Sequence, residues 1–132
     1  MSLIERKKKV NLNLNLMENK LIKLPDTERS VGTSLKGSFR GYKFIEIYAA
    51  FGAPSYDNYD PESIFNKELS EYKKVQVEWD FEFNGAIFTI YDWKTHDRLY
   101  TLSENEVWNV GGKTNASDFI DHIIYFLNQN RN

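Results

Sequence analysis

The clearest structural signal in the chain is a run in which apolar and polar residues alternate. From Val75 to Phe83 every second residue is apolar, and the residues between them are Gln76, Glu78, Asp80 and Glu82. Side chains of a β-strand point alternately to its two faces. The run therefore predicts a strand with one apolar and one acidic face.

A hairpin is predicted directly after this strand. Asn84-Gly85 favours a type I′ turn, because both central residues of that turn need a positive φ, and the return strand spans about residues 86–93. A two-residue turn sets the register, so the core face pairs Phe83 with Ala86, Phe81 with Phe88 and Trp79 with Ile90. The outer face then pairs Glu82 with Ile87, Asp80 with Thr89, Glu78 with Tyr91 and Gln76 with Trp93.

Two helices are predicted from apolar residues at helical spacing. The first spans about residues 42–51 and carries one apolar stripe, made of Phe44, Ile47, Tyr48 and Phe51. Gly52 and Pro54 end it. The second spans about residues 116–127, and its apolar face holds Ile120, Ile123, Ile124 and Leu127.

Further strands are predicted over residues 33–39 and 106–110, and residues 55–73 form a long polar loop with one helical turn. The order strand, helix, loop, hairpin, strand, helix predicts a single α+β domain over residues 31–132. We expect an antiparallel sheet of about four strands with the Asn-Gly hairpin at its centre and both helices on one face.

Residues 1–30 form a basic N-terminal arm in this prediction. Val10, Leu12, Leu14 and Leu16 alternate with asparagines, a pattern typical of an edge strand or of a strand completed by a partner. Residues 1–43, which include Arg6, Lys7, Lys8 and Lys9, hold ten Lys/Arg against four Asp/Glu, a net charge of +6. Residues 44–132 hold seven against fifteen, a net charge of −8. The arm either solubilises the chain or contacts nucleic acid, an acidic protein or a second copy.

Composition limits the class of protein. At 132 residues, of which 41% are hydrophobic, the chain is long enough for one domain with a real core. It has no cysteine, which excludes disulfides, a thiol nucleophile and thiolate-bound zinc or iron–sulfur sites. Neither a membrane-spanning run nor a signal-peptide pattern is present, so we expect an intracellular protein without membrane contact.

Metal-dependent chemistry has weak support in the sequence. His96 and His122 are the only histidines, and the spacing of Asp118 and His122 is better explained by an exposed ion pair than by a metal site. Asp92-Trp93-Lys94, at the end of the return strand, loosely resembles the PD-(D/E)xK nucleases, in which carboxylates of adjacent strands hold magnesium. The hairpin register places Asp92 on the face opposite the acids of the preceding strand. We therefore favour a strand-end hydrogen-bonding role for Asp92, and expect no metal and no cofactor.

Gly111, Gly112 and Lys113 precede the last predicted helix and form a candidate anion-binding turn, since backbone N–H groups are free at a helix start. The segment lacks the first glycine of the Walker pattern, and a tight strand-to-helix turn explains it better. No G-x-S-x-G motif occurs. A small-ligand or nucleotide binder, or a metal-dependent nuclease-like enzyme, is the alternative to a binding protein.

Protein binding is the function that the predicted surface favours. Ile87, Tyr91 and Trp93 share the outer face with Glu78, while Tyr56 and Tyr59 lie in the long loop. Aromatic side chains beside acids are typical of protein interfaces, provided that neither the arm nor the loop covers them. The same acids repel a phosphate backbone, so nucleic acid is expected at the arm alone.

Several short pieces occur together in one order: residues 33–37 (TSLKG), 51–54 (FGAP), 78–79 (EW), 89–94 (TIYDWK) and 108–112 (WNVGG). Over about residues 33–127 the series resembles small uncharacterised proteins of bacteriophages and large DNA viruses. The resemblance implies a viral accessory or virion protein, located in the host cytoplasm or the virion. It brings no activity and no catalytic residues. We predict a non-enzymatic binding protein that engages a host or virion protein, with self-association through the arm as a further contact.

Overall fold

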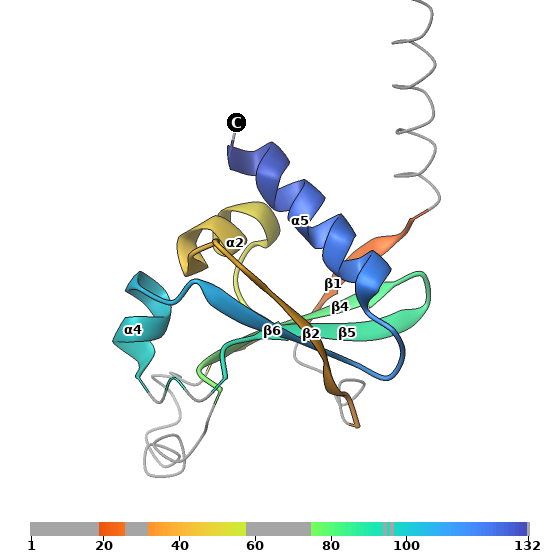
Figure 1. The fold of residues 1–132 in the computed structure, drawn as a ribbon, viewed down its shortest axis with the longest axis horizontal. Helices are drawn as coiled ribbons and strands as arrows, with labels where there is room; N and C mark the ends of the chain where they lie inside the picture. The colour runs from red at the N-terminus through yellow and green to blue at the C-terminus, as the bar shows by residue number, and fades with distance from the viewer. Residues whose placement is uncertain (1–18, 26–31, 58–74, 94, 96, 132) are drawn as a thin grey trace, which may run out of the picture.

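An antiparallel sheet of six strands runs through the part of the chain that the structure describes (Figure 1). The computed structural model describes residues 19–25, 32–57, 75–93, 95 and 97–131. The strands are β1 (Leu21–Leu24), β2 (Ser34–Arg40), β3 (Tyr56–Asp57), β4 (Val77–Phe83), β5 (Ala86–Tyr91) and β6 (Val107–Gly112). The helices are α2 (Phe44–Phe51), α4 (Arg98–Ser103) and α5 (Ser117–Arg131). The chain thus has the predicted α+β class with an antiparallel sheet.

The strands lie in the order β1-β4-β5-β6-β2, and β3 also pairs with β4. β1 pairs with residues 80–83 of β4 and β3 with residues 77–78, so two short strands share one edge of β4. The predicted number of about four strands is too low, because strands of four and two residues are too short to show a period. β1 comes from residues 1–30, so the sheet includes part of the segment that the sequence assigned to the arm.

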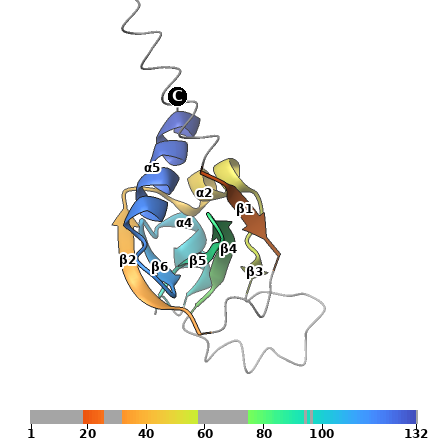
Figure 2. The same cartoon turned by 90° about the vertical axis from the view of Figure 1, so that its right-hand side faces the viewer.

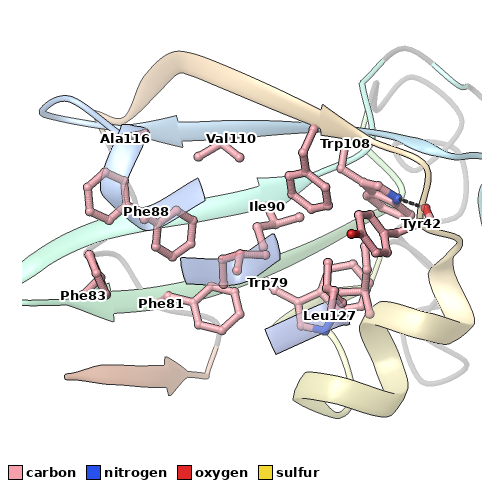
Figure 3. Packing of buried hydrophobic residues seen from close by; sticks show 14 of the residues in the cluster. Tyr42, Trp79, Phe81, Phe83, Phe88, Ile90, Trp108, Val110, Ala116 and Leu127 are labelled. Atoms are coloured by element: carbon pink, nitrogen blue, oxygen red, sulfur yellow. Dashed lines mark hydrogen bonds between the residues drawn. The ribbon is translucent and has the colours of Figure 1, made fainter. Parts of the chain in front are cut away.

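Helices α2 and α5 lie on the same side of a curved sheet, whose margins are β2 and β1 (Figure 2). Their apolar side chains pack with those of the central strands into one cluster (Figure 3). Trp79 and Trp108 are at its centre, with ring centroids 5.6 Å apart. Each indole N–H is satisfied by a backbone carbonyl, that of Gly52 for Trp79 at 2.9 Å and that of Tyr42 for Trp108 at 2.7 Å.

β4 and β5 are joined by Asn84 and Gly85, whose φ angles are 51° and 83°. Phe83 pairs with Ala86 and Glu78 with Tyr91, with no register shift between these pairs. Both strands are shorter than predicted, since β4 begins at Val77 and β5 ends at Tyr91. The strands are shorter because the side-chain carboxylate of Asp92 accepts the backbone N–H groups of Gln76 and Val77.

β6 continues through Gly111 and Gly112, where the sequence predicted its end. A β-carbon on Gly111 would lie 2.6 Å from the Thr89 hydroxyl oxygen, and one on Gly112 would lie 2.8 Å from the Phe88 ring. Glycine therefore lets β5 and β6 approach each other, and the pair does not mark a turn at a helix start.

The helices differ from the prediction at their ends. α5 continues to Arg131, whose guanidinium lies 4.2 Å from the Tyr42 ring centroid and forms an ion pair with Glu46 of α2. α4 has no counterpart among the predicted elements. The Asp97 carboxylate caps it by accepting the Tyr100 N–H at 3.2 Å, and Arg98 forms an ion pair with Asp57 of β3. The described part of the chain therefore has three helices where the sequence predicted two.

Candidate functional site

Asp92 is a structural carboxylate. It is fully buried, and its Oδ1 accepts the backbone N–H groups of Gln76 at 2.8 Å and Val77 at 2.9 Å. Its Oδ2 accepts the hydroxyls of Thr95 at 2.6 Å and Thr101 at 2.9 Å. Four donors therefore satisfy the two oxygens, as the strand-end hydrogen-bonding interpretation of Asp92 requires.

Among the described residues, Asp92 and the acids of β4 are not brought to one face, as the nuclease-like alternative would require. The β4–β5 register runs without a shift from Glu78 to Phe83, so Glu78 and Glu82 project to the face opposite the core. Asp92 is instead held by the first backbone amides of β4 and by α4. Among the described residues, no group of three or more histidine, aspartate and glutamate side chains is placed to hold a metal ion.

A row of side chains crosses the outer face of the sheet near α4. Tyr56 of β3 pairs with Glu78 of β4, and Glu78 pairs with Tyr91 of β5. Paired residues of neighbouring antiparallel strands project to the same face, so two tyrosines flank one carboxylate. The structure therefore brings together three residues that the sequence selected from separate segments.

Trp93 extends this row. Its ring centroid lies 6.1 Å from that of Tyr91, with the ring planes at 80°, an edge-to-face contact. Trp93 is 46% exposed, whereas Trp79 and Trp108 are completely buried. We call Tyr56, Glu78, Tyr91 and Trp93 together the outer aromatic site.

The site is partly shielded from water. Burial, and then the negative charge of Glu78, raise the pKa of Tyr91 above its usual value of 10.0. The phenol therefore stays protonated at neutral pH and keeps its hydrogen-bond donor. The site offers aromatic faces, two phenolic hydroxyls and one carboxylate.

The predicted binding surface is smaller than expected. Ile87, which was expected on the exposed outer face, is only 9% exposed, and Asp80 and Thr89 on the same face are buried. The outer face is therefore buried around Asp80, Thr89 and Ile87 and half-buried in the row of Tyr56, Glu78 and Tyr91. Tyr59 and the arm residues Arg6, Lys7, Lys8 and Lys9 lie outside the described residues.

Two other predicted features have structural roles. Gly111 and Gly112 lie inside β6, paired with β5 on one side and β2 on the other, so they do not form an anion-binding turn before α5. Lys113 is exposed just beyond them. His122, for which an exposed ion pair with Asp118 was expected, is buried against the rings of Phe83 and Phe126, at centroid distances of 5.1 and 5.0 Å.

The sequence analysis predicted neither α4 nor the exposed apolar side chains on the helices. Leu99 and Tyr100 of α4 and Ile45 of α2 are all exposed. The cap at Asp97 is the local signal that could have located α4, since aspartate is a favoured residue at that position. A six-residue helix is too short to show a helical period.

The chain has no significant match among protein-family models, curated proteins or solved structures. Within the described residues, no helix is both long and apolar enough to span a membrane. Evidence for a function therefore comes from the residues and their geometry.

Proposed function

We propose that this chain is a non-enzymatic binding protein that engages a protein partner through the outer aromatic site. The observation that carries the proposal is the exposure of Trp93 on the outer face, in edge-to-face contact with Tyr91. Tryptophan and tyrosine are the side chains that most often dominate the binding energy of protein interfaces. A protein partner would bury the part of Trp93 that now faces solvent.

The backbone beneath the site is held in place. Asp92 lies between Tyr91 and Trp93 in the sequence, and its four hydrogen bonds join it to the start of β4, to Thr95 and to Thr101 of α4. A fixed backbone presents the two rings with little conformational entropy left to lose on binding. This arrangement supports a binding surface that is formed before the partner arrives.

The kind of partner follows from the resemblance to bacteriophage and large-DNA-virus proteins. On that basis we propose a viral accessory or virion component, acting in the host cytoplasm or the virion on a host or virion protein. A basic arm at residues 6–9 is proposed as a second contact, with nucleic acid or a second copy.

Affinity capture from host lysate or infected cells tests the proposal. Trp93→Glu places a charge in the site, and Ile45→Glu is the matched control, because Ile45 is exposed on α2 across the sheet. We expect proteins that the wild type and Ile45→Glu both retain to be lost with Trp93→Glu, at equal thermal stability of all three. Retention of the same proteins by Trp93→Glu would overturn the proposal.

A further inference from the structure

We propose that an extended, acidic segment of a protein partner adds to the sheet as a further strand along β2. β2 forms the margin of the sheet opposite β1 and is separated from β5 by β6 (Figure 2). The proposal therefore concerns a second interaction surface, which does not depend on the outer aromatic site. We call the side of residues 36–40 that faces away from β6 the β2 edge.

The backbone of β2 carries the inference. β2 pairs with β6 on one side, and within the described residues no strand pairs with it on the other. Just after the strand, the Gly41 N–H donates to the Glu106 carbonyl at 2.9 Å. Residues that bond to the neighbour alternate with residues that do not in an antiparallel pair, so the next residue bonded to β6 is Phe39. The N–H and C=O groups of Ser38 and Arg40 therefore point to the β2 edge.

The β2 edge is regular where these groups lie. The register shift in β2 falls between Leu35 and Gly37, so residues 37–40 pair with β6 without interruption. Ser38 and Arg40 are both exposed. A row of outward backbone donors and acceptors is a template for a further strand, which gains main-chain hydrogen bonds along its length.

The charges on β2 determine the kind of strand that fits. Lys36 and Arg40 are exposed, and among the described residues neither forms an ion pair. Two β2 strands paired about Ser38 would place Lys36 of one copy opposite Arg40 of the other, and like charges in this position are destabilising. Lysine on an edge strand is a common protection against such self-pairing. An acidic strand is attracted to the same cations, so the charges favour an acidic partner over a second copy.

The faces of the sheet define the side chains of the partner strand. The residues opposite Ser38 and Arg40 would share the outer face, because directly paired residues project to the same face. The residue opposite Gly37 would project to the core face, beside α5. Ile120 of α5 is half-buried there, and its Cδ1 would lie 2.7 Å from a β-carbon on Gly37. An apolar side chain would cover Ile120, so we expect alternating polar and apolar residues with an acid opposite Arg40.

A short peptide with this pattern tests the inference. The probe is acetylated, amidated Glu-Val-Thr-Val-Glu, titrated into the isotope-labelled full chain and followed by the backbone amide signals. We expect saturable binding with a dissociation constant of about 1 mM or lower, and slower hydrogen exchange at the Ser38 and Arg40 amides. Glutamine in place of both glutamates should weaken binding about fivefold. Equal affinity of the two peptides would overturn the acidic partner.

Methylation of the peptide backbone separates strand addition from charge attraction. A methyl group on the threonine nitrogen removes the donor that would meet the Ser38 carbonyl, and it should abolish binding. A methyl group on the nitrogen of the following valine faces away from β2 and should change the affinity by less than about twofold. Equal effects of the two methyl groups would show that no strand is added.

Charge variants locate the bound peptide. Arg40→Gln should weaken binding of the glutamate peptide about threefold and leave the glutamine peptide unaffected. Lys23→Gln is the matched control, because it removes the same charge from an exposed residue of β1, at the other margin of the sheet. Trp93→Glu should bind the glutamate peptide as the wild type does. Loss of binding in Lys23→Gln or Trp93→Glu would place the peptide elsewhere and overturn the inference, whatever the outcome of the capture experiment.

Hydrogen exchange in the free chain tests the other occupants of the β2 edge. The Ser38 and Arg40 amides should exchange quickly without peptide, as exposed N–H groups do. Protection that rises with protein concentration would mean that a second copy occupies the edge. Protection at every concentration would mean that another segment of the same chain covers it. Either result would overturn the assignment to a partner.

Discussion

The hydroxyl of Thr101 donates a hydrogen bond to the buried carboxylate of Asp92 at 2.9 Å, which joins α4 to the strand end that carries Tyr91 and Trp93. The other Asp92 oxygen accepts two backbone amides at the start of β4. One side chain therefore connects β4, β5 and α4 directly beneath the outer aromatic site. Substitutions at Asp92 should lower the stability of the fold and, as a consequence, disturb the positions of the Tyr91 and Trp93 rings.

Asp92→Ala should lower the free energy of unfolding by about 3 kcal/mol, because two buried backbone amides and two hydroxyls lose their acceptor together. Thr101→Val removes one of the four donors and should cost about 1 kcal/mol. Urea unfolding followed by circular dichroism measures both values. Equal, small losses in the two variants would show that Asp92 is not the connection we describe.

Gly111→Ala should destabilise the sheet by about 2 kcal/mol, because the new β-carbon would lie 2.6 Å from the Thr89 hydroxyl oxygen. Thr89→Ala removes that oxygen and should rescue part of the loss. A double-mutant cycle in urea unfolding gives the interaction energy. If the effects of Gly111→Ala and Thr89→Ala are strictly additive, the destabilisation by Gly111→Ala does not come from this contact.

The turn residue Asn84 has two separate functions in the fold. Its φ of 51° is unfavourable for most residues, and its side chain joins the turn to β1 by accepting the Lys20 N–H at 2.9 Å and donating to Asn19 at 3.0 Å. Asn84→Gly keeps the turn geometry and should cost about 1 kcal/mol, whereas Asn84→Ala should cost about 2 kcal/mol. Thermal unfolding distinguishes the two variants, and the opposite order would contradict this explanation.

Stability should fall at mildly acidic pH because of His122. Burial lowers the pKa of His122 below its usual value of 6.5, so the unfolded chain takes up a proton before the folded chain does. The contribution of His122 to stability is therefore complete above about pH 6.5 and is lost as the pH falls toward the lowered pKa, by at most about 1.4 kcal/mol per pH unit.

His122→Phe tests this pH dependence, because phenylalanine keeps a ring between Phe83 and Phe126 but has no proton to bind. Urea unfolding at pH 7.5 and 5.5 should show a smaller loss of stability in the variant than in the wild type. An unchanged slope would assign the pH dependence to other groups.

Local patterns predicted the parts of the fold that depend on neighbouring residues. The alternation from Val77 to Phe83 and the positive φ that Asn84-Gly85 supplies are enough to decide which side chains of β4 and β5 face the core. α2 and α5 are helices because their apolar residues follow the helical period. The length of α5 was not predictable in the same way, since Arg131 is tied to Glu46 and Tyr42, which are distant in sequence.

The sequence predicted most residues of the candidate site but not how they come together. Glu78, Tyr91 and Trp93 were assigned to one face from the hairpin register, but their meeting with Tyr56 depends on β3, a two-residue strand. Likewise, the sequence showed Ile87 on the outer face but not that this part of the face is buried. Exposure depends on every segment that packs nearby, and no local pattern contains that information.

The sequence by itself determined the α+β class, the strand and helix periods and the faces of the central hairpin, because these follow from backbone geometry repeated over a few residues. Only the tertiary structure decided which strands share an edge, which outer side chains remain open and which acid is buried. Asp92 shows the difference most clearly, since three of its four donors, on Gln76, Val77 and Thr101, come from segments brought together only when the chain folds.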